Sequence, residues 1–433
     1  MTSIADSGPR DTPSSAFVAQ NAVRRANLAR IVENIVVHRS RSRAELAVDT
    51  GMNKTTVSSL VNELLDMRLV REAGREQRRQ AGRPSTRLVL DGNWIGLMGL
   101  EIDVYHMGVY ATNLQGDPLH REFRVVDNRN RPIADCFDEL ADMATDARDE
   151  LARAGVTLAD ITVALPGFVD EARGELLHAA YLGWRNVPVV KLLRERIDDP
   201  DVGIRVGNDT NLAAYAEMHD GHGQDGGPRD FIYVGCPKGL GSGIVVDGDV
   251  LGGVAGFVGE IGHITVDPHG PQCKCGNQGC LERLAGPDAL LDRAGITPYG
   301  MLSASPRDSL AELVRRAEDA DSTVLEALAD MRAWLSIGLA SAINIFHPQS
   351  VVLSGYLAPL SPWISGDLET DLADRVYGSR WRSCEVLTSS LGELIASRGA
   401  SARSRQAILR DPSRVKELAS RSQATPASSA PTH

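Results

Sequence analysis

The chain has 433 residues, of which 42% are hydrophobic and 24% charged, which is ordinary for a globular protein of two or three domains. No apolar run approaches membrane-spanning length and residues 1–20 lack the apolar core of a signal peptide, so we expect a cytoplasmic protein. The net charge of −11 divides unevenly: residues 1–92 carry 15 basic and 10 acidic side chains (+5), and the remainder carries 31 and 47 (−16). This uneven distribution of charge predicts that residues 1–92 alone bind a polyanion.

Residues 21–92 have the pattern of a winged helix-turn-helix domain. Apolar residues at helical spacing over 28–36 indicate a first helix. Ser42 and Glu45 are spaced as a capping box for a second helix, and Gly51 follows it as a turn residue. Asn53 can cap a third helix with one apolar face and one small, hydrogen-bonding face. Such a third helix is suited to entering the major groove of DNA.

Two short strands, 69–71 and 87–90, are predicted next, and the loop between them is rich in arginine. A ribbon of this kind is a wing, in which Gly82-Arg83-Pro84 would insert into a narrow minor groove while other arginines contact phosphates. A solvated basic loop or a protein-docking module is the alternative, but the combination with a polar helix face favours DNA binding. The predicted DNA contacts are Asn53, Lys54, Thr55, Thr56, Ser59, Arg78, Arg79 and Arg83.

From residue 94 onward, strands and helices alternate, which indicates an α/β architecture of two lobes. A meander is predicted at 95–102, 107–112 and 123–126, and a helix over 134–154. Strands at 161–165 and 204–206 follow, the second ending at Asn208 and Asp209, where a helix begins. The second lobe is expected to start near residue 231 and to contain a glycine-rich segment at 239–243, a long helix at 322–346 and a buried strand at 351–353. Sites in such folds lie at strand ends, here in a cleft between the lobes.

The most informative stretch is 259–282, which holds three of the six cysteines. Cys273, Cys275 and Cys280, with His263 upstream, form a ligand set that suits tetrahedral structural zinc. His269 is an alternative fourth ligand. A disulfide or a reactive thiol cluster would be another use of the cysteines, although a Cys-x-Cys pair bridges poorly.

Two carboxylates, Glu260 and Glu282, flank this stretch, so a bound metal would hold both of them beside an imidazole. Together with Asn208 and Asp209 they offer hydrogen-bonding groups that suit the hydroxyls of a sugar. The Asn-Asp pair alone is a weak signal, because such pairs often only cap a helix.

These motifs closely resemble the ROK family of sugar kinases and transcriptional repressors. The likeness rests on the cysteine stretch and on Leu165-Pro-Gly-Phe-Val-Asp170, Leu182-Gly-Trp-Arg-Asn-Val-Pro188, Gly207-Asn-Asp-Thr-Asn211 and Gly239-Leu-Gly-Ser-Gly243, and it covers most of residues 94–400. It implies an actin-like, ribonuclease-H-like two-lobed ATPase fold with a structural zinc knuckle, here behind the winged helix-turn-helix domain. It also implies that His263, instead of His269, is the fourth zinc ligand. The sugar contacts that it implies are Asn208, Asp209, Glu260, His263 and Glu282.

The resemblance and the composition together give the expected domain boundaries. We predict a disordered tail at 1–20, the DNA-binding domain at 21–92, a first lobe at 93–229 and a second lobe with the zinc site at 230–395. A C-terminal helix at 396–419 would return to the first lobe, and 420–433 would be a second disordered tail.

One departure from the family bears on activity. The family's kinases carry Asp-x-Gly-Gly-Thr against the ATP phosphates, whereas the matching place here reads Glu101-Ile-Asp-Val-Tyr105. Asp103 and Val104 would fill the phosphate space, and Glu101 and Asp103 add negative charge with no evident cation to offset it. Phosphoryl transfer depends on positioning and charge neutralisation, so we predict no kinase activity. Asp209, which matches the kinases' catalytic base, would then only bind sugar.

The sequence therefore predicts a sugar-responsive DNA-binding regulator, most simply a repressor of genes for carbohydrate uptake or catabolism. It would bind palindromic operator DNA as a homodimer or homotetramer and respond to a monosaccharide or a sugar phosphate. Two alternatives remain: an active sugar kinase with an appended DNA-binding domain, and a regulator controlled by a protein partner.

Overall fold

The computed structural model describes residues 15–76, 85–224, 226–235, 239–252, 257–297, 306–416 and 418–419. The chain divides into two compact units. The larger unit is Trp94–Ser404, and the smaller combines the residues up to Asn93 with those from Arg405 onward. None of the helices in the described ranges is long and apolar enough to span a bilayer.

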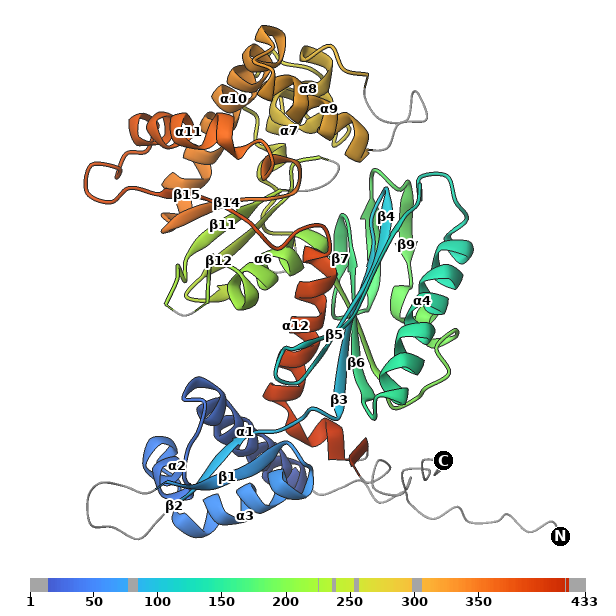
Figure 1. The fold of residues 1–433 in the computed structure, drawn as a ribbon, viewed down its shortest axis with the longest axis vertical. Helices are drawn as coiled ribbons and strands as arrows, with labels where there is room; N and C mark the ends of the chain where they lie inside the picture. Colours follow the sequence, from blue (N-terminus) through green and yellow to red (C-terminus); the bar gives the residue numbers. More distant parts are fainter. Residues whose placement is uncertain are drawn as a thin grey trace, which may run out of the picture. The chain divides into compact units, whose positions relative to one another are not determined.

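In the described residues up to Asn93, the smaller unit contains three helices and a two-stranded ribbon, as the sequence predicts (Figure 1). They are α1 (Ser15–Val37), α2 (Arg43–Thr50), α3 (Lys54–Asp66) and the antiparallel pair β1 (Val70–Glu76) and β2 (Ser85–Leu90). The capping box is confirmed, because the Ser42 hydroxyl accepts the backbone N–H of Glu45 and the Glu45 carboxylate accepts that of Ser42. Gly51 has a φ of 71°, a conformation that glycine adopts without strain.

The core of the smaller unit is built from apolar positions one helical turn apart. The fully buried side chains include Leu28, Ile31, Ile35, Leu46, Val57, Leu60, Leu64 and Leu88. The predicted tail at 1–20 is wrong over its last residues, because α1 already begins at Ser15; residues 1–14 lie outside the described ranges.

The prediction that 396–419 returns to the first lobe is confirmed up to Ser404, where Ser397, Ser401 and Ser404 hydrogen-bond to first-lobe strands, and is wrong beyond it. Helix α12 (Ile395–Arg410) starts in the larger unit, but the residues after Ser404 group with the smaller one. There the short η3 turn (Pro412–Val415), whose Val415 is buried, packs against α1. The physical reason is that η3 finds a partner surface on α1, a contact that the local sequence does not encode.

The first lobe of the larger unit is built on a five-stranded sheet in the order β10-β6-β3-β4-β5. Strands β3 (Ile95–Ile102), β4 (His106–Asn113) and β5 (Pro118–Val125) form the predicted meander, and β6 (Thr157–Leu165) and β10 (Gly203–Asn208) add in parallel. A small antiparallel sheet, β7 (Phe168–Asp170), β8 (Glu175–Ala179) and β9 (Trp184–Val187), lies beside it, with helices α4 (Ile133–Arg153) and α5 (Val189–Arg194).

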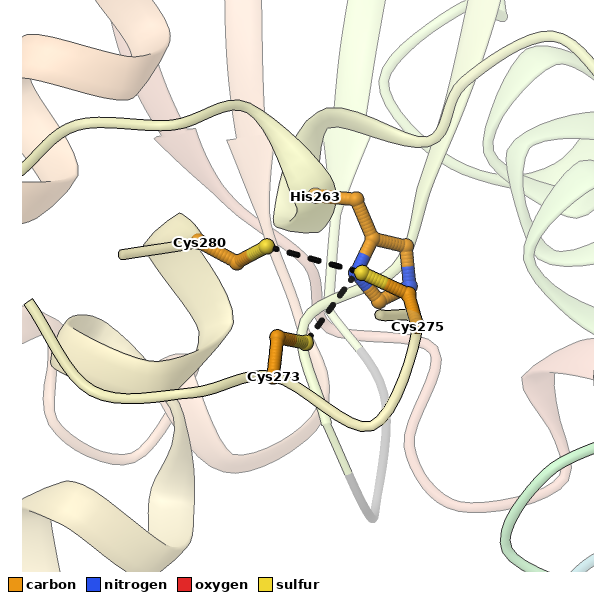
Figure 2. A group of neighbouring side chains, drawn as sticks. All are labelled: His263, Cys273, Cys275 and Cys280. Carbon is orange, nitrogen blue, oxygen red and sulfur yellow. Dashed lines mark hydrogen bonds between the residues drawn. The ribbon is translucent and has the colours of Figure 1, made fainter. Parts of the chain in front are cut away.

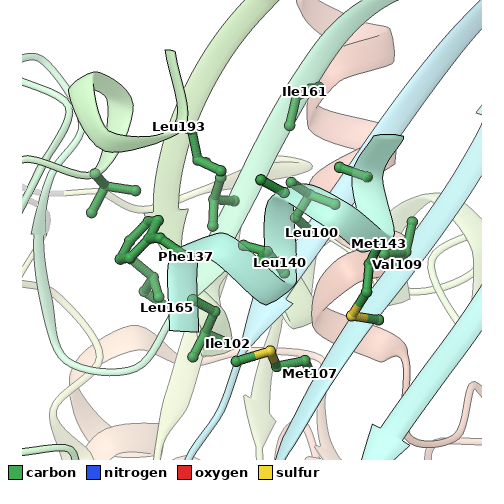
Figure 3. Close-up of a cluster of buried hydrophobic side chains, with 14 of the residues drawn as sticks. Leu100, Ile102, Met107, Val109, Phe137, Leu140, Met143, Ile161, Leu165 and Leu193 are labelled. Carbon is green, nitrogen blue, oxygen red and sulfur yellow. The ribbon is translucent and has the colours of Figure 1, made fainter. Parts of the chain in front are cut away.

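The two faces of strand β3 pack against different helices, because successive side chains of a strand alternate between faces. Leu100 and Ile102 pack with Phe137 and Leu140 of α4 in a fully buried cluster (Figure 3). On the other face α12 comes so close that a Cβ on Gly99 would lie 1.7 Å from the Ser397 carbonyl oxygen, which excludes any other residue there.

The second lobe repeats the strand arrangement of the first. Its sheet has the order β13-β12-β11-β14-β15: an antiparallel meander of β11 (Phe231–Val234), β12 (Ser242–Val246) and β13 (Asp249–Val250), extended in parallel by β14 (Ser350–Leu353) and β15 (Glu385–Thr388). The helices are α6 (Asp209–Asp220), α7 (Leu281–Ala285), α8 (Pro287–Arg293), α9 (Pro306–Glu318), α10 (Ser322–Phe346) and α11 (Ser361–Arg375). The predicted two-lobed α/β fold is confirmed, and the shared strand order makes the lobes two copies of one topology (Figure 1).

Candidate functional site

The four residues predicted to hold zinc come together in the second lobe (Figure 2). His263 ends the short η1 turn (Ile261–His263), and Cys280 immediately precedes α7. The ligand atoms all lie within 4.8 Å of one another, with 3.7 Å between Cys273 Sγ and His263 Nδ1 and 3.7 Å between Cys275 Sγ and Cys280 Sγ. Tetrahedral zinc with ordinary bond lengths would set two sulfurs about 3.8 Å apart and a sulfur and a nitrogen about 3.6 Å apart. The cluster therefore has the spacing of a metal site.

Two of the alternatives raised by the sequence, a disulfide and His269 as the fourth ligand, do not match this geometry. A disulfide requires a sulfur–sulfur distance of about 2.05 Å, and all three cysteines are free. His269 is outside the cluster. Gly279 has a φ of 65°, and a Cβ there would lie 1.5 Å from the Asp267 carbonyl oxygen, so glycine is required where the loop turns back towards Cys280.

The charge of the cluster also suits a cation. Without a bound ion, burial and the neighbouring sulfurs of Cys273 and Cys275 raise the pKa of Cys280 to about 12. Three thiolates can coexist here only if a positive ion compensates them, and a divalent metal does this. The other ring nitrogen of His263, Nε2, lies 3.8 Å from Glu260 Oε2, so an ion bound at Nδ1 would orient the ring towards this carboxylate.

Asn208 and Asp209 lie where the sequence predicts, at the end of β10. Asn208 caps α6: its side-chain oxygen accepts the N–H of Asn211 at 2.9 Å and the hydroxyl of Thr210 at 2.8 Å. The capping interpretation that the sequence left open is thus confirmed for Asn208. Asp209 is buried, and burial, followed by the charge of Asp103, raises its pKa well above the usual range. A carboxyl of this kind can form a hydrogen bond with a ligand hydroxyl.

Glu260 and Glu282 extend this group of acids towards the metal cluster. Desolvation raises the pKa of Glu260, the His263 charge lowers it, and Glu282 raises it further; Glu260 in turn raises the pKa of Asp209. The three carboxyls are therefore electrostatic neighbours. The carboxylate of Glu282 accepts hydrogen bonds from the Tyr181 hydroxyl at 2.5 Å and from the Leu240 N–H at 3.1 Å. No sequence pattern pointed to Tyr181, which is 101 residues away from Glu282.

At the turn between β3 and β4 the buried His106 lies against Glu101 and Asp103, which corrects the expectation that no group is available to offset their charge. His106 Nε2 lies 2.9 Å from Glu101 Oε1, and Nδ1 lies 3.4 Å from Asp103 Oδ1. Burial alone would lower the pKa of His106, but the two carboxylates outweigh it and raise the pKa to about 10. The other oxygen of Glu101 accepts the Ser397 N–H in the first turn of α12 at 3.1 Å. We refer to Glu101, Asp103 and His106 as the ion cluster.

A cavity of about 350 Å³ adjoins the ion cluster. It is mainly apolar, and Asp209 is one of its lining residues, whereas Glu260, Glu282 and the four metal-cluster residues are not. The lining side chains include Tyr105, His106, Phe123, Tyr233, Arg307 and Tyr356. Arg307 is paired with Glu393 and lies over the Phe123 ring, 4.4 Å from its centroid, so this guanidinium is already engaged within the chain.

The residues predicted to contact DNA lie around the start of α3. The Asn53 side chain accepts the N–H of Thr56 at 2.8 Å and so caps this helix. Lys54, Thr55 and Ser59 are exposed on α3, and Thr56 is partly exposed. The predicted wing contacts Arg78, Arg79 and Arg83 lie outside the described residues.

Comparison with known proteins places this geometry in a family. The sequence profile of the ROK family matches residues 97–407, which is most of the chain. The chain belongs to the ROK family. It is 29% identical over 374 residues to the xylose repressor of Bacillus subtilis (strain 168), covering 86% of this chain and 93% of that protein. It is also 29% identical over 336 residues to the DNA-binding transcriptional dual regulator NagC of Escherichia coli (strain K12), covering 77% and 81%.

Solved ROK structures have the same fold. A ROK family transcriptional regulator, described as a homolog of the E. coli MLC protein, superposes with a TM-score of 0.76 at 22% identity and covers 91% of this chain and 99% of its own. A ROK family glucokinase from Streptomyces griseus, solved with glucose and AMPPNP, gives a TM-score of 0.59 at 24% identity and covers 72% and 99%. The predicted ROK fold is thus confirmed.

Proposed function

We propose that this protein is a sugar-responsive transcriptional repressor, in which the ROK body senses a monosaccharide and the smaller unit binds operator DNA. The observation that carries the proposal is the likeness to the xylose repressor over 86% of the chain, which reaches well beyond the ROK profile at 97–407. The capped α3 helix with its exposed polar face supports DNA binding by the smaller unit. We further propose that the protein acts as a homodimer or homotetramer on a palindromic site, since symmetric dimers read symmetric DNA.

The metal cluster would support this body as a structural zinc site. Three thiolates and an imidazole favour zinc, and four protein ligands leave no open position for catalysis. The ion would fix His263 next to Glu260 and would hold the start of α7, which carries Glu282. We propose that a monosaccharide or its phosphate binds beside the cluster, with Asn208, Asp209, Glu260, His263 and Glu282 as its contacts.

We infer that the body does not transfer phosphate. The β3–β4 turn is occupied by the ion cluster, and the adjacent cavity is mainly apolar and offers an arginine that is already paired. Phosphoryl transfer needs free cationic groups or backbone N–H groups against the phosphates. Sugar-dependent ATP turnover at on the order of 1–100 per second would instead favour the sugar-kinase alternative.

Binding of DNA through α3 gives a first test. Changing the exposed Lys54 to alanine should weaken binding to all DNA sequences alike and reduce the salt dependence of log Kd by about one unit, because one phosphate contact is lost. Fluorescence anisotropy with labelled duplexes at several salt concentrations measures both quantities. The control is Lys191→Ala on the larger unit, which removes the same charge from an exposed site. Equal effects of the two changes would contradict an interface on α3.

The effector site gives a second test. D-xylose and N-acetyl-D-glucosamine are the first probes, because relatives are named for them, and their phosphates complete the panel. An active sugar should change the affinity for a selected duplex by about 5–150-fold, the usual range of allosteric coupling. Asp209→Ala should remove this response and leave DNA affinity without sugar close to wild type, whereas the exposed Asp374→Ala should retain the response. If no sugar shifts either melting temperature or DNA binding, control by a protein partner becomes the better hypothesis.

A further inference from the structure

Both oxygens of Glu282 are held by groups of the chain itself. The Tyr181 hydroxyl donates to Oε1 at 2.5 Å, and the backbone N–H of Leu240 donates to Oε2 at 3.1 Å. Tyr181 belongs to the first lobe, in the turn between β8 and β9, whereas Glu282 and Leu240 belong to the second. The tyrosine therefore reaches across from one lobe to a carboxylate of the other.

The phenol ring is fixed by the metal loop. Lys274, between the ligands Cys273 and Cys275, places its ammonium 4.8 Å from the Tyr181 ring centroid, within cation–π range. Gly239 leaves the necessary room beside the ring: a Cβ there would lie 2.5 Å from Glu282 Oε2 and 3.4 Å from a carbon of the Tyr181 ring. The metal loop, the glycine-rich segment and the acid thus hold the side chain in one position.

The hydrogen bond that Tyr181 makes is chemically the same as one that a sugar would make. A phenol and a sugar hydroxyl both present an O–H donor, and an O–H to an ionised carboxylate is among the stronger hydrogen bonds in proteins. A sugar hydroxyl that used the same lone pair of Glu282 Oε1 would have to remove Tyr181 first, because the two oxygen atoms cannot share one position.

On the basis of the effector site proposed above, we propose that Tyr181 is an internal competitor for the sugar. In the sugar-free protein its hydroxyl occupies the position of a ligand hydroxyl on Glu282, and the bound sugar displaces it. The competitor sets a threshold for affinity: a sugar that cannot replace the Tyr181–Glu282 hydrogen bond with a better one does not bind.

Displacement also changes how the lobes are connected. Release of the Tyr181 hydroxyl removes a polar link between the lobes, whereas the aromatic contact between Phe168 of β7 and Phe257 of the second lobe, with ring centroids 4.7 Å apart, does not depend on Glu282. Sugar binding would therefore exchange a contact between the lobes for a contact with the ligand. The sugar would then bind more tightly to the state in which the Tyr181–Glu282 hydrogen bond is broken than to the state in which it is formed.

The test is Tyr181→Phe in the full-length protein, titrated with D-xylose and N-acetyl-D-glucosamine by isothermal calorimetry. The change removes the hydroxyl but keeps the ring that Lys274 contacts. We expect the sugar Kd to fall by on the order of tenfold, because a hydrogen bond to a charged group no longer has to be broken. Tyr377→Phe is the matched control, since this tyrosine is 89% exposed, and it should leave the Kd unchanged.

Glu282→Gln and Asp209→Ala separate the two proposals. If both variants lose sugar binding while Tyr181→Phe binds no more tightly than wild type, the competitor proposal is overturned and the effector site stands. If both bind sugar like wild type, the effector site itself is wrong. Sugar binding by Tyr181→Phe but not by wild type would support the competitor proposal directly. If neither wild type nor any variant binds either sugar, both proposals are overturned. A purely structural tyrosine would lower the melting temperature without tightening the Kd.

Discussion

Replacing Cys275 with serine should release the metal ion and lower the free energy of unfolding of the second lobe by several kcal/mol. Structural zinc contributes about 10–16 kcal/mol of apparent binding free energy in zinc-finger peptides, and a three-ligand site retains only part of it. Cys275 is the informative position because its side chain is exposed, whereas Cys273 and Cys280 are buried. Loss of packing therefore adds little to the effect of losing the ligand.

The measurement combines elemental analysis with thermal unfolding. Wild-type protein should hold one zinc ion per chain, and Cys275→Ser substantially less, with a lower melting temperature that excess zinc partly restores. Cys384→Ser makes the same chemical change outside the cluster and should alter neither quantity. Wild-type protein purified without stoichiometric metal, or equal effects of the two serine variants, would rule out the metal site.

The features that the sequence predicted well are those encoded over short distances. The capping box of Ser42 and Glu45, the Asn53 cap and helix α10 over Ser322–Phe346 depend on spacing within one or a few turns. The four residues of the metal cluster could also be predicted from the sequence, because they lie within eighteen consecutive positions, from 263 to 280.

The features that the sequence did not predict depend on residues far apart in the chain. Tyr181 is hydrogen-bonded to Glu282, 101 residues away in the sequence, and Glu101 is hydrogen-bonded to Ser397, 296 residues away. Neither pairing leaves a periodic pattern, since each depends on how complete lobes pack. The packing of η3, which contains Val415, against α1 was missed for the same reason. His106 was a different failure: it is three residues from Asp103, and a hairpin turn with facing acids and a histidine was a local signal for an ion cluster.

Changing His106 to glutamine is the second prediction with a large expected effect. His106 is 5% exposed and lies between two buried carboxylates, so its loss would leave Glu101 and Asp103 facing each other without a cation. Breaking a buried ion pair by removing one partner typically destabilises a protein by about 3–5 kcal/mol. The hydrogen bond from the Ser397 N–H to Glu101 depends on the same arrangement, so the start of α12 should also become less protected from amide hydrogen exchange.

The pH dependence of stability gives a sharper test of the same cluster. The folded pKa of His106 is about 10, above the value of about 6.5 for an unfolded histidine. Its contribution is therefore fully present below pH 6.5 and is lost as the pH rises through 10, with a slope of up to about 1.4 kcal/mol per pH unit. Urea denaturation between pH 6.5 and 9.5 should show this decline in wild type and in the exposed-site control His38→Gln, but much less of it in His106→Gln.

A double variant separates charge from packing. If the loss in His106→Gln comes from two uncompensated carboxylates, then neutralising one of them as well, in Glu101→Gln/His106→Gln, should recover part of the stability, so the two changes are not additive. If the histidine matters only for its contacts, including its stacking on Phe123 with ring centroids 4.8 Å apart, the second change should add a further loss. A recovered double variant with a flat pH profile would mean that the β3–β4 turn, which the sequence leads us to expect at the place of the kinases' phosphate loop, is held by an internal ion pair that anchors α12.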